Sequence, residues 1–223
     1  MTEEFKLMQN IKGVIFDLDG TLIDSMWIWG DVAEAYLRSH GAVPHSNFRE
    51  ALRTLNTTEE AQHYIDVYGI DLPVDEVAQG RDNLMKEYLK DVVELKAGVL
   101  QALKELKKRG VRMCIATATD RPLVEVSIER HGLDEYIEHI FTCTEENTSK
   151  SSPDIYFQAA KFLGTDISET LVVEDALYAM KTASEAGFVV AGVYDKVSDD
   201  EQDEIKSTCD YYWVTMDEML KEN

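Results

Sequence analysis

The hydrophobic positions of the chain fall into short, nearly continuous runs that are separated by stretches with helical spacing. Six runs are typical of strands covered on both faces: 13–19, 111–117, 139–143, 170–175, 189–194 and 210–214. Amphipathic patterns at 98–110, 120–132 and 151–164 lie between the later runs, and each of them ends at a glycine. This alternation predicts an α/β fold, with a doubly wound, Rossmann-like parallel sheet.

Residues 26–93 interrupt the alternation, because they contain helical patterns and no convincing strand. The patterns predict helices at about 26–41, 47–54, 57–69 and 74–92. We therefore expect a helical domain at 26–93, inserted into an α/β domain made of 1–25 and 94–223. A further acidic stretch, 197–207, is typical of a solvated helical face.

The composition is that of a folded protein with a strongly acidic surface. Of the 223 residues, 44% are apolar, and 43 acidic against 22 basic residues give a formal net charge of −21. A surface of this kind repels nucleic acid and anionic membranes, so we expect neither as a partner. An anionic substrate would be repelled as well, unless positive charge such as a metal ion were concentrated at its binding site.

The cysteines and the hydropathy bear on the cellular compartment. Cys114, Cys143 and Cys209 lack the spacing of a CxxC motif, and two of them lie in or beside apolar runs, which favours buried, reduced thiols in a cytoplasmic protein. The N-terminal residues do not resemble a secretory signal, and no apolar stretch approaches the roughly 18 residues of a membrane span. We expect a monomer or a weak dimer.

Polar side chains that could take part in catalysis or ligand binding follow four of the predicted strands. In a doubly wound sheet, ligands bind beyond the carboxyl ends of the strands. The segment "VIFDLDGTLID" places two acids at the end of the first strand, and Thr119 and Asp120 continue the loop after the second. The candidates that would gather at this edge are Asp17, Asp19, Thr117, Lys150, Glu174 and Asp175.

These residue types suit a phosphate substrate and Mg²⁺. Carboxylate oxygens are the ligands that Mg²⁺ prefers. In an extended strand, residues two apart point the same way, so Asp17 could attack phosphorus while Asp19 handles the proton of the leaving oxygen. The Thr117 hydroxyl and the Lys150 ammonium could bind the phosphoryl oxygens.

Each signal alone has an ordinary explanation. An Asp-x-Asp-Gly sequence is often a loop or part of a calcium site, although here only Asp24 follows as a further ligand before the chain turns apolar. A single lysine is usually solvated, and a threonine is a common strand residue. A receiver-like signalling module, switched by a phosphorylated aspartate, would also place acids, a hydroxyl and a lysine at one sheet edge. Receivers are about half this length and lack a helical insert.

The four motifs together resemble the haloacid dehalogenase superfamily of phosphotransferases. "DLDGT" at 17–21, Thr117 after an apolar strand, Lys150 in "KSSPDIY" and the acid pair in "LVVEDA" appear in the same order as in that superfamily. The helical insert resembles its helical cap. The resemblance is strongest to the branch that contains beta-phosphoglucomutase and phosphoglycolate-type phosphatases.

The resemblance implies a role for each position. Asp17 would be the nucleophile and Asp19 the general acid and base. Mg²⁺ would be bound by Asp17, the backbone carbonyl of Asp19, and Asp175, with Glu174 ligating or orienting. The transferring phosphoryl group would be bound by Thr117, Lys150 and the backbone amides of Leu18 and Ala118. The implied activity is Mg²⁺-dependent hydrolysis of a small phosphate monoester through an aspartyl-phosphate. Sugar phosphates belong to this class of phosphorylated metabolites.

Two further distinctions follow from the resemblance. Dehalogenases lack the second aspartate of the first motif, so Asp19 favours a phosphate substrate. Beta-phosphoglucomutase has a histidine where this chain has Trp29, which makes a sugar-phosphate mutase the alternative rather than the leading hypothesis. Substrate selection would lie in the helical insert, where the candidate residues are Trp27, Trp29, Arg53 and Arg81.

Overall fold

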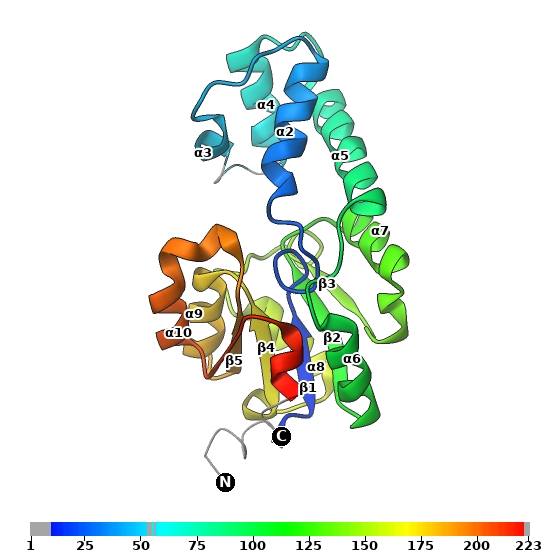
Figure 1. The fold of residues 1–223 in the computed structure, drawn as a ribbon, viewed down its shortest axis with the longest axis vertical. Coiled ribbons are helices and arrows are strands. Elements are labelled where there is room, and N and C mark those ends of the chain that lie inside the picture. The colour runs from blue at the N-terminus through cyan, green and yellow to red at the C-terminus, as the bar shows by residue number, and fades with distance from the viewer. Residues whose placement is uncertain (1–9, 53–54, 56, 221–223) are drawn as a thin grey trace. The chain divides into compact units, whose positions relative to one another are not determined.

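The computed structural model describes residues 10–52, 55 and 57–220. They divide into two compact units, an α/β unit of residues 1–26 and 94–223 and a helical unit of residues 27–93. The sequence placed the first boundary one residue earlier, between 25 and 26. Figure 1 shows the strands gathered in one unit and a group of helices in the other.

The α/β unit is built on a six-stranded sheet in which every pairing is parallel. Its strands are β1 (Gly13–Phe16), β2 (Arg112–Thr117), β3 (Ile140–Thr142), β4 (Thr170–Glu174), β5 (Val189–Val193) and β6 (Tyr211–Trp213). Their order in the sheet is β3-β2-β1-β4-β5-β6. β1 therefore lies between β2 and β4, with Phe16 paired to Ile115 on one side and to Val173 on the other. The predicted doubly wound parallel sheet is confirmed.

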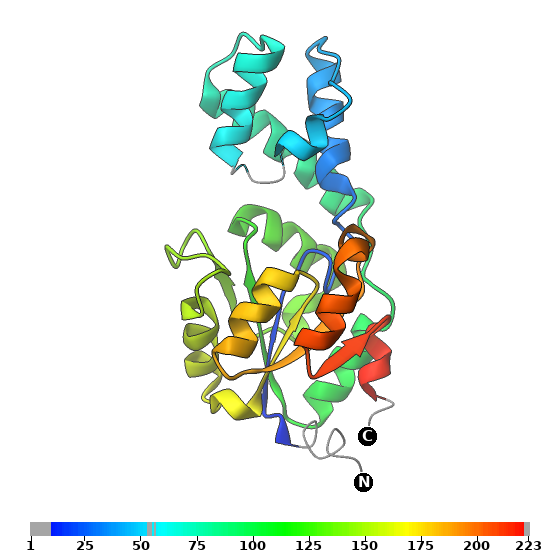
Figure 2. The ribbon, with the colours of Figure 1, turned by 90° about the vertical axis from the view of Figure 1, so that its left-hand side faces the viewer.

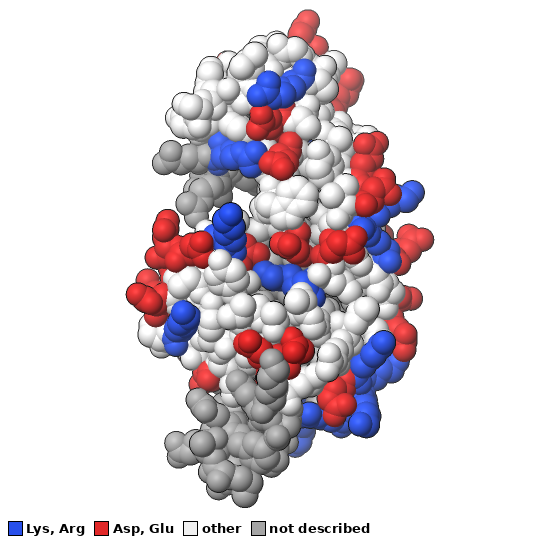
Figure 3. Space-filling view, in the orientation of Figure 1, with Lys and Arg blue, Asp and Glu red and all other residues white. Residues whose placement is uncertain are grey.

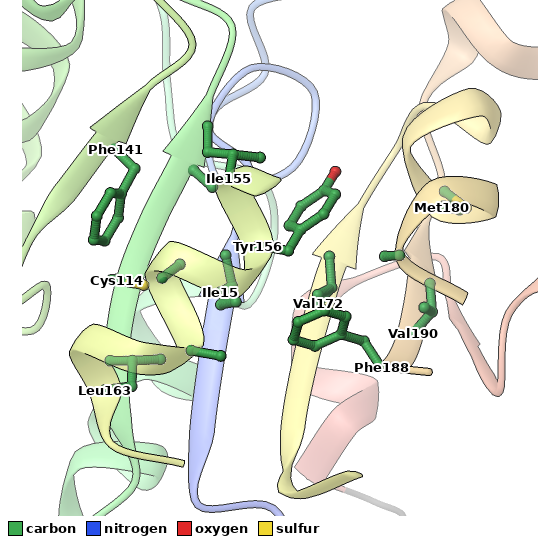
Figure 4. Packing of buried hydrophobic residues seen from close by; sticks show 14 of the residues in the cluster. Ile15, Cys114, Phe141, Ile155, Tyr156, Leu163, Val172, Met180, Phe188 and Val190 are labelled. Carbon is green, nitrogen blue, oxygen red and sulfur yellow. The ribbon is translucent and has the colours of Figure 1, made fainter. Parts of the chain in front are cut away.

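The connecting helices are α6 (Val99–Lys108), α7 (Arg121–His131), α8 (Asp154–Leu163), α9 (Leu177–Glu185) and α10 (Gln202–Thr208), and they lie on both faces of the sheet (Figures 1 and 2). Figure 4 shows the apolar cluster on one face of the sheet, in which Ile15 and Val172 meet Tyr156 and Leu163 of α8. Strand residues alternate between faces, so Val14 and Phe16, both fully buried, point to the other side. Burial on both faces explains why the strand sequences are continuously apolar.

The described part of the unit also contains four short 3₁₀ segments. They are η1 (Leu133–Glu135), η2 (Ile167–Glu169), η3 (Lys196–Glu201) and η4 (Met216–Leu220). The single helix predicted at 197–207 is divided between η3 and α10, and the backbone leaves helical geometry at Ser198. Among the described residues, each helix is too short or too polar to cross a membrane. On the face drawn in Figure 3, acidic and basic side chains are interspersed over both units.

The two segments that lead into and out of the helical unit are paired with each other inside the α/β unit. Ile23 forms an antiparallel bridge with Leu95. The amide of Asp24 donates to the carbonyl of Glu94 at 2.9 Å, and the amide of Lys96 donates to the carbonyl of Leu22 at 3.0 Å. The chain therefore leaves the α/β unit and returns to it at adjacent positions.

The helical unit contains α2 (Ile28–Ser39), α3 (Phe48–Leu52), α4 (Thr57–Tyr68) and α5 (Val74–Asp91). Its apolar core joins Tyr36 and Leu37 of α2 with Tyr64 of α4 and Val77 of α5. The predicted helix at 47–54 corresponds to α3, and residues 53 and 54 lie outside the described residues.

A buried ion pair lies within the same unit. The guanidinium of Arg81 on α5 is 3.3 Å from a carboxylate oxygen of Glu60 on α4, with side chains only 6% and 10% exposed. Tyr64 donates its hydroxyl to Glu60, and the ring of Trp29 lies 4.9 Å from the Arg81 guanidinium carbon. The pair connects α4 to α5 inside the unit and contacts α2 through Trp29.

We predict that removing one partner of this pair destabilises the helical unit more than removing both charges. Arg81→Met should lower the free energy of unfolding by about 3 kcal/mol, because Glu60 is left buried without its cation. The double variant Glu60→Gln/Arg81→Met keeps an acceptor for Tyr64 and should recover part of that loss. Denaturant unfolding of the wild type, Arg81→Met, Glu60→Gln and the double variant tests this, and additive losses of unfolding free energy would contradict the coupling.

Candidate active site

Asp17 and Asp19 lie just beyond β1, in a tight loop rather than in the strand. The prediction extended the strand to residue 19, whereas it ends at Phe16, and the amide of Asp17 still donates to the carbonyl of Val173 on β4 at 2.9 Å. The loop closes through the carbonyl of Leu18, which accepts the amides of Leu22 and Ile23 at 2.9 and 3.0 Å. Both aspartates are thereby held at the carboxyl edge of the sheet.

Gly20 allows this loop to pass close to Asp175. Its φ is +81°, and a Cβ at this position would lie 2.3 Å from a carboxylate oxygen of Asp175. A side chain would be both strained and in collision with that carboxylate. The glycine of "DLDGT" therefore makes room for an acid that comes from the end of β4.

Lys150 lies among the acids and pairs with two of them. Its ammonium donates to Asp17 Oδ1 and, at 2.5 Å, to Glu174 Oε1. Burial pushes the pKa of Lys150 down, but the charges of Asp17 and Glu174 outweigh it, and the pKa lies well above the usual value. Lys150, at 4% exposure, is therefore a buried cation held between two carboxylates.

Asp19 is held by two hydroxyl groups that come from different segments. Ser25 donates to Asp19 Oδ1 at 2.6 Å, and Thr119 donates to Asp19 Oδ2 at 2.7 Å. Burial raises the pKa of Asp19, the Ser25 hydrogen bond opposes that rise, and the charge of Asp17 adds to it. A raised pKa favours the protonated form, which is the form that can donate a proton.

Thr117 stands at the end of β2, next to the loop that carries Thr119. Its hydroxyl oxygen accepts the amide of Thr119 at 3.1 Å, and its side chain is buried. Of the two backbone positions predicted to bind phosphate, Leu18 is buried and Ala118 is exposed, each in the loop that follows its strand. Their role in phosphate binding stays a prediction.

Three carboxylates could hold a metal ion. Asp17, Glu174 and Asp175 are buried, and one oxygen of each lies within 4.8 Å of the others. Burial raises the pKa of Asp175 well above its usual value, and the charges of Asp17 and Glu174 add to the rise. Glu174 Oε2 is also buried with no hydrogen-bond partner among the described residues. Crowded hard oxygens of this kind fit a divalent cation such as Mg²⁺.

The four segments predicted to meet at the carboxyl edge are thus brought together by contacts of Asp17, Asp19, Thr119, Lys150 and Glu174. The hydroxyl donors Ser25 and Thr119, and the Tyr156 hydroxyl that reaches Glu174, were not among the candidate residues. A signal existed for Thr119, which follows Thr117 in the loop after a strand. Nothing local in the sequence marks Ser25 or Tyr156.

The candidate specificity residues have varied surroundings. Trp27 precedes α2 and is 42% exposed, whereas Trp29 is half-buried beneath the Arg81 guanidinium. Arg81 is buried and paired with Glu60 and Asp82. Arg53 lies outside the described residues. A role of these side chains in substrate selection stays a prediction.

Comparison with known proteins identifies the family to which the chain belongs. The sequence profile of haloacid dehalogenase-like hydrolases matches residues 14–193, which is most of the chain and includes the loops that carry all the acids. The chain belongs to the haloacid dehalogenase-like hydrolase family. The resemblance stated from the four motifs is therefore confirmed.

Relatives of this hydrolase include phosphatases. It is 31% identical over 183 residues to the bifunctional riboflavin kinase/FMN phosphatase of Arabidopsis thaliana, a match that covers 81% of this chain and 48% of that protein. The chain thus spans about half the length of that relative. It is 24% identical to the fructose-1-phosphate phosphatase of Escherichia coli, over 81% of this chain and 95% of that one.

The fold of the hydrolase is also found in solved structures. A beta-phosphoglucomutase from Clostridium difficile superimposes with a TM-score of 0.69 at 16% identity, over 93% of this chain and 92% of the other. At this identity the match shows the shared fold alone. It agrees with the predicted α/β fold with a helical insert.

The acid cluster makes a prediction for stability in the absence of metal. Burial raises the pKa of Glu174 from 4.5 to about 7. Between these pH values the folded protein binds more protons at Glu174 than the unfolded chain does. The contribution of Glu174 to the free energy of unfolding is therefore full below about pH 4.5 and is lost as the pH rises to about 7.

Denaturant unfolding in EDTA at pH 5 and pH 7.5 measures this loss. Glu174→Gln should make the decrease in unfolding free energy smaller, by on the order of 2 kcal/mol, because the amide does not titrate. Glu125→Gln, on the exposed face of α7, serves as the matched control. Equal decreases in the wild type and Glu174→Gln would show that Glu174 does not titrate in this range.

Proposed function

We propose that this hydrolase is a Mg²⁺-dependent phosphatase that cleaves small phosphate monoesters through an aspartyl-phosphate. The observation that carries the proposal is the arrangement of Asp17 and Asp19 beyond one strand, with Lys150, Glu174 and Asp175 from other segments against them. Family membership and the two phosphatase relatives support the same reaction class.

In the first half-reaction, a carboxylate oxygen of Asp17 attacks phosphorus and the bond from phosphorus to the ester oxygen breaks. Asp19, protonated, gives its proton to the departing oxygen, so the product leaves as a neutral alcohol. The raised pKa of Asp19 favours the protonated acid at the start of this step. Lys150 and Thr117 are the side chains proposed to bind the phosphoryl oxygens.

In the second half-reaction, water attacks the phosphorus of the aspartyl-phosphate. Asp19, now ionised, accepts the proton from that water, which regenerates its protonated form. The bond between phosphorus and the Asp17 oxygen breaks, inorganic phosphate leaves, and the Asp17 carboxylate is restored. Each proton that Asp19 donates is therefore returned within one cycle.

Asp17, Glu174 and Asp175 are the side chains that would hold Mg²⁺. When bound, the ion supplies positive charge that offsets the repulsion between the anionic phosphoryl group and the attacking carboxylate. On the family resemblance, the backbone carbonyl of Asp19 would be a fourth ligand. A local cation would also offset the negative potential of the acidic surface, which on its own would repel a phosphorylated substrate.

The substrate is proposed to be a small phosphorylated metabolite, and sugar phosphates are included because one relative is a fructose-1-phosphate phosphatase. A cytoplasmic location and a monomeric or weakly dimeric state stay predictions. Cys114 and Cys143 are buried free thiols, which is compatible with a reducing compartment. The helical insert and the family match argue against the receiver-like switch.

We predict that the protein hydrolyses p-nitrophenyl phosphate in the presence of Mg²⁺ and that EDTA abolishes the turnover. Asp17→Asn should reduce kcat by about 1,000-fold or more, because the amide is a poor nucleophile. Asp166→Asn, an exposed residue before β4 at the opposite edge of the sheet, should retain wild-type turnover. Substantial turnover by Asp17→Asn would contradict the assignment of the nucleophile.

A panel of metabolite monoesters, followed by phosphate release, separates phosphatase from mutase. We expect phosphate to be released from at least one monoester at a rate above that for p-nitrophenyl phosphate. The panel should contain FMN, fructose 1-phosphate and both glucose phosphates. Interconversion of the glucose phosphates without phosphate release would instead establish the mutase.

A further inference from the structure

The two carboxylate oxygens of Glu174 have different surroundings. Oε1 accepts a hydrogen bond from Lys150 at 2.5 Å and a second one from the Tyr156 hydroxyl at 3.3 Å. Oε2 is buried and has no hydrogen-bond partner among the described residues. An unsatisfied carboxylate oxygen in a fully buried residue is costly, so the difference between the two oxygens calls for an explanation.

Tyr156 is placed to hold this orientation from within the core. Its ring is 1% exposed and belongs to the apolar cluster that α8 forms against the sheet, with the ring of Phe188 6.1 Å away. Figure 4 shows the ring among these side chains and its hydroxyl oxygen toward the carboxyl ends of the strands. A phenylalanine could fill the same space, so the hydroxyl is the feature that packing alone does not require.

Lys150 holds the same oxygen, but it is shared. Its ammonium also donates to Asp17, and the proposed reaction places a phosphoryl group against it. A donor that is drawn toward the substrate cannot alone fix Glu174 throughout a catalytic cycle. The Tyr156 hydroxyl has no such second partner among the contacts of the described residues, and its position is set by the packing of α8.

We propose that Tyr156 is a positioning residue that keeps Glu174 turned with Oε2 toward the cation site formed with Asp17 and Asp175. The proposal rests on the proposed function, since it assigns a task to a side chain behind the Mg²⁺ ligands. With Oε1 occupied by Tyr156 and Lys150, rotation of the carboxylate would break two hydrogen bonds. Groups of this kind behind a metal ligand commonly contribute 10–100-fold to metal affinity, by the general rule for such contacts.

The test is calorimetric titration of MgCl₂ into metal-stripped wild type and Tyr156→Phe. The variant keeps the ring and removes only the hydroxyl, and its Kd for Mg²⁺ should rise by about tenfold. Tyr64→Phe is the matched control, because it removes a hydroxyl that donates to a buried glutamate in the helical unit. Its Kd for Mg²⁺ should equal that of the wild type.

A second readout separates positioning from packing. The Mg²⁺ concentration for half-maximal p-nitrophenyl phosphate turnover should rise about tenfold in Tyr156→Phe, with kcat largely restored at saturating Mg²⁺. A merely structural role would lower the unfolding temperature in EDTA and leave the Kd unchanged.

The outcomes distinguish this inference from the proposed function. Equal Kd values for the wild type and Tyr156→Phe, with clear binding by both, would overturn the role of Tyr156 alone. Failure of the wild type to bind Mg²⁺ at all would overturn both this role and the proposed cofactor.

Discussion

The structure of the carboxyl edge depends on Lys150, a buried cation set among buried carboxylates. Asp17, Asp19, Glu174 and Asp175 are each less than a tenth exposed, and a group of anions this dense is unstable without positive charge. Lys150 pairs directly with two of them, and hydroxyl groups hold a third. Asp17, Glu174 and Asp175 crowd three buried carboxylates together, and their oxygens are the ones that fit a divalent cation. The crowding of buried carboxylates, which is costly for the fold, is therefore also the feature on which the proposed cation site depends.

The sequence predicted the fold and the principal acids because both follow from local patterns and one topological rule. Continuous apolar runs alternating with helices specify a parallel sheet, and such a sheet brings the ends of its strands to one edge. The prediction that β1 extends to Asp19 was wrong, because Gly20 allows a tight loop to form immediately after Phe16. The periodicity of side chains in a strand could not reveal that loop.

Contacts between distant segments were beyond the reach of sequence patterns. Thr119 and Asp19 are 100 residues apart, and Tyr156 and Glu174 reach each other from α8 and β4. A helical periodicity marks Tyr156 as a core residue but cannot say that its hydroxyl meets a carboxylate. In the helical unit, Arg81 was a candidate for substrate contact, and the sequence did not reveal that it pairs with Glu60 on another helix as well as with Asp82. Such pairings depend on how helices pack, and packing is not periodic.

The segments around Ile23 and Leu95 are paired at the point where the helical unit is inserted into the α/β unit. Because the chain departs and returns at neighbouring positions, the intervening residues amount to one closed loop, and the cost of closing a loop grows only slowly with its length. An insert at this point can lengthen, shorten or change its helices without altering the order or register of any strand. Sequence variation can thus accumulate in 27–93, while the strands that carry the acids at the carboxyl edge keep their pairing.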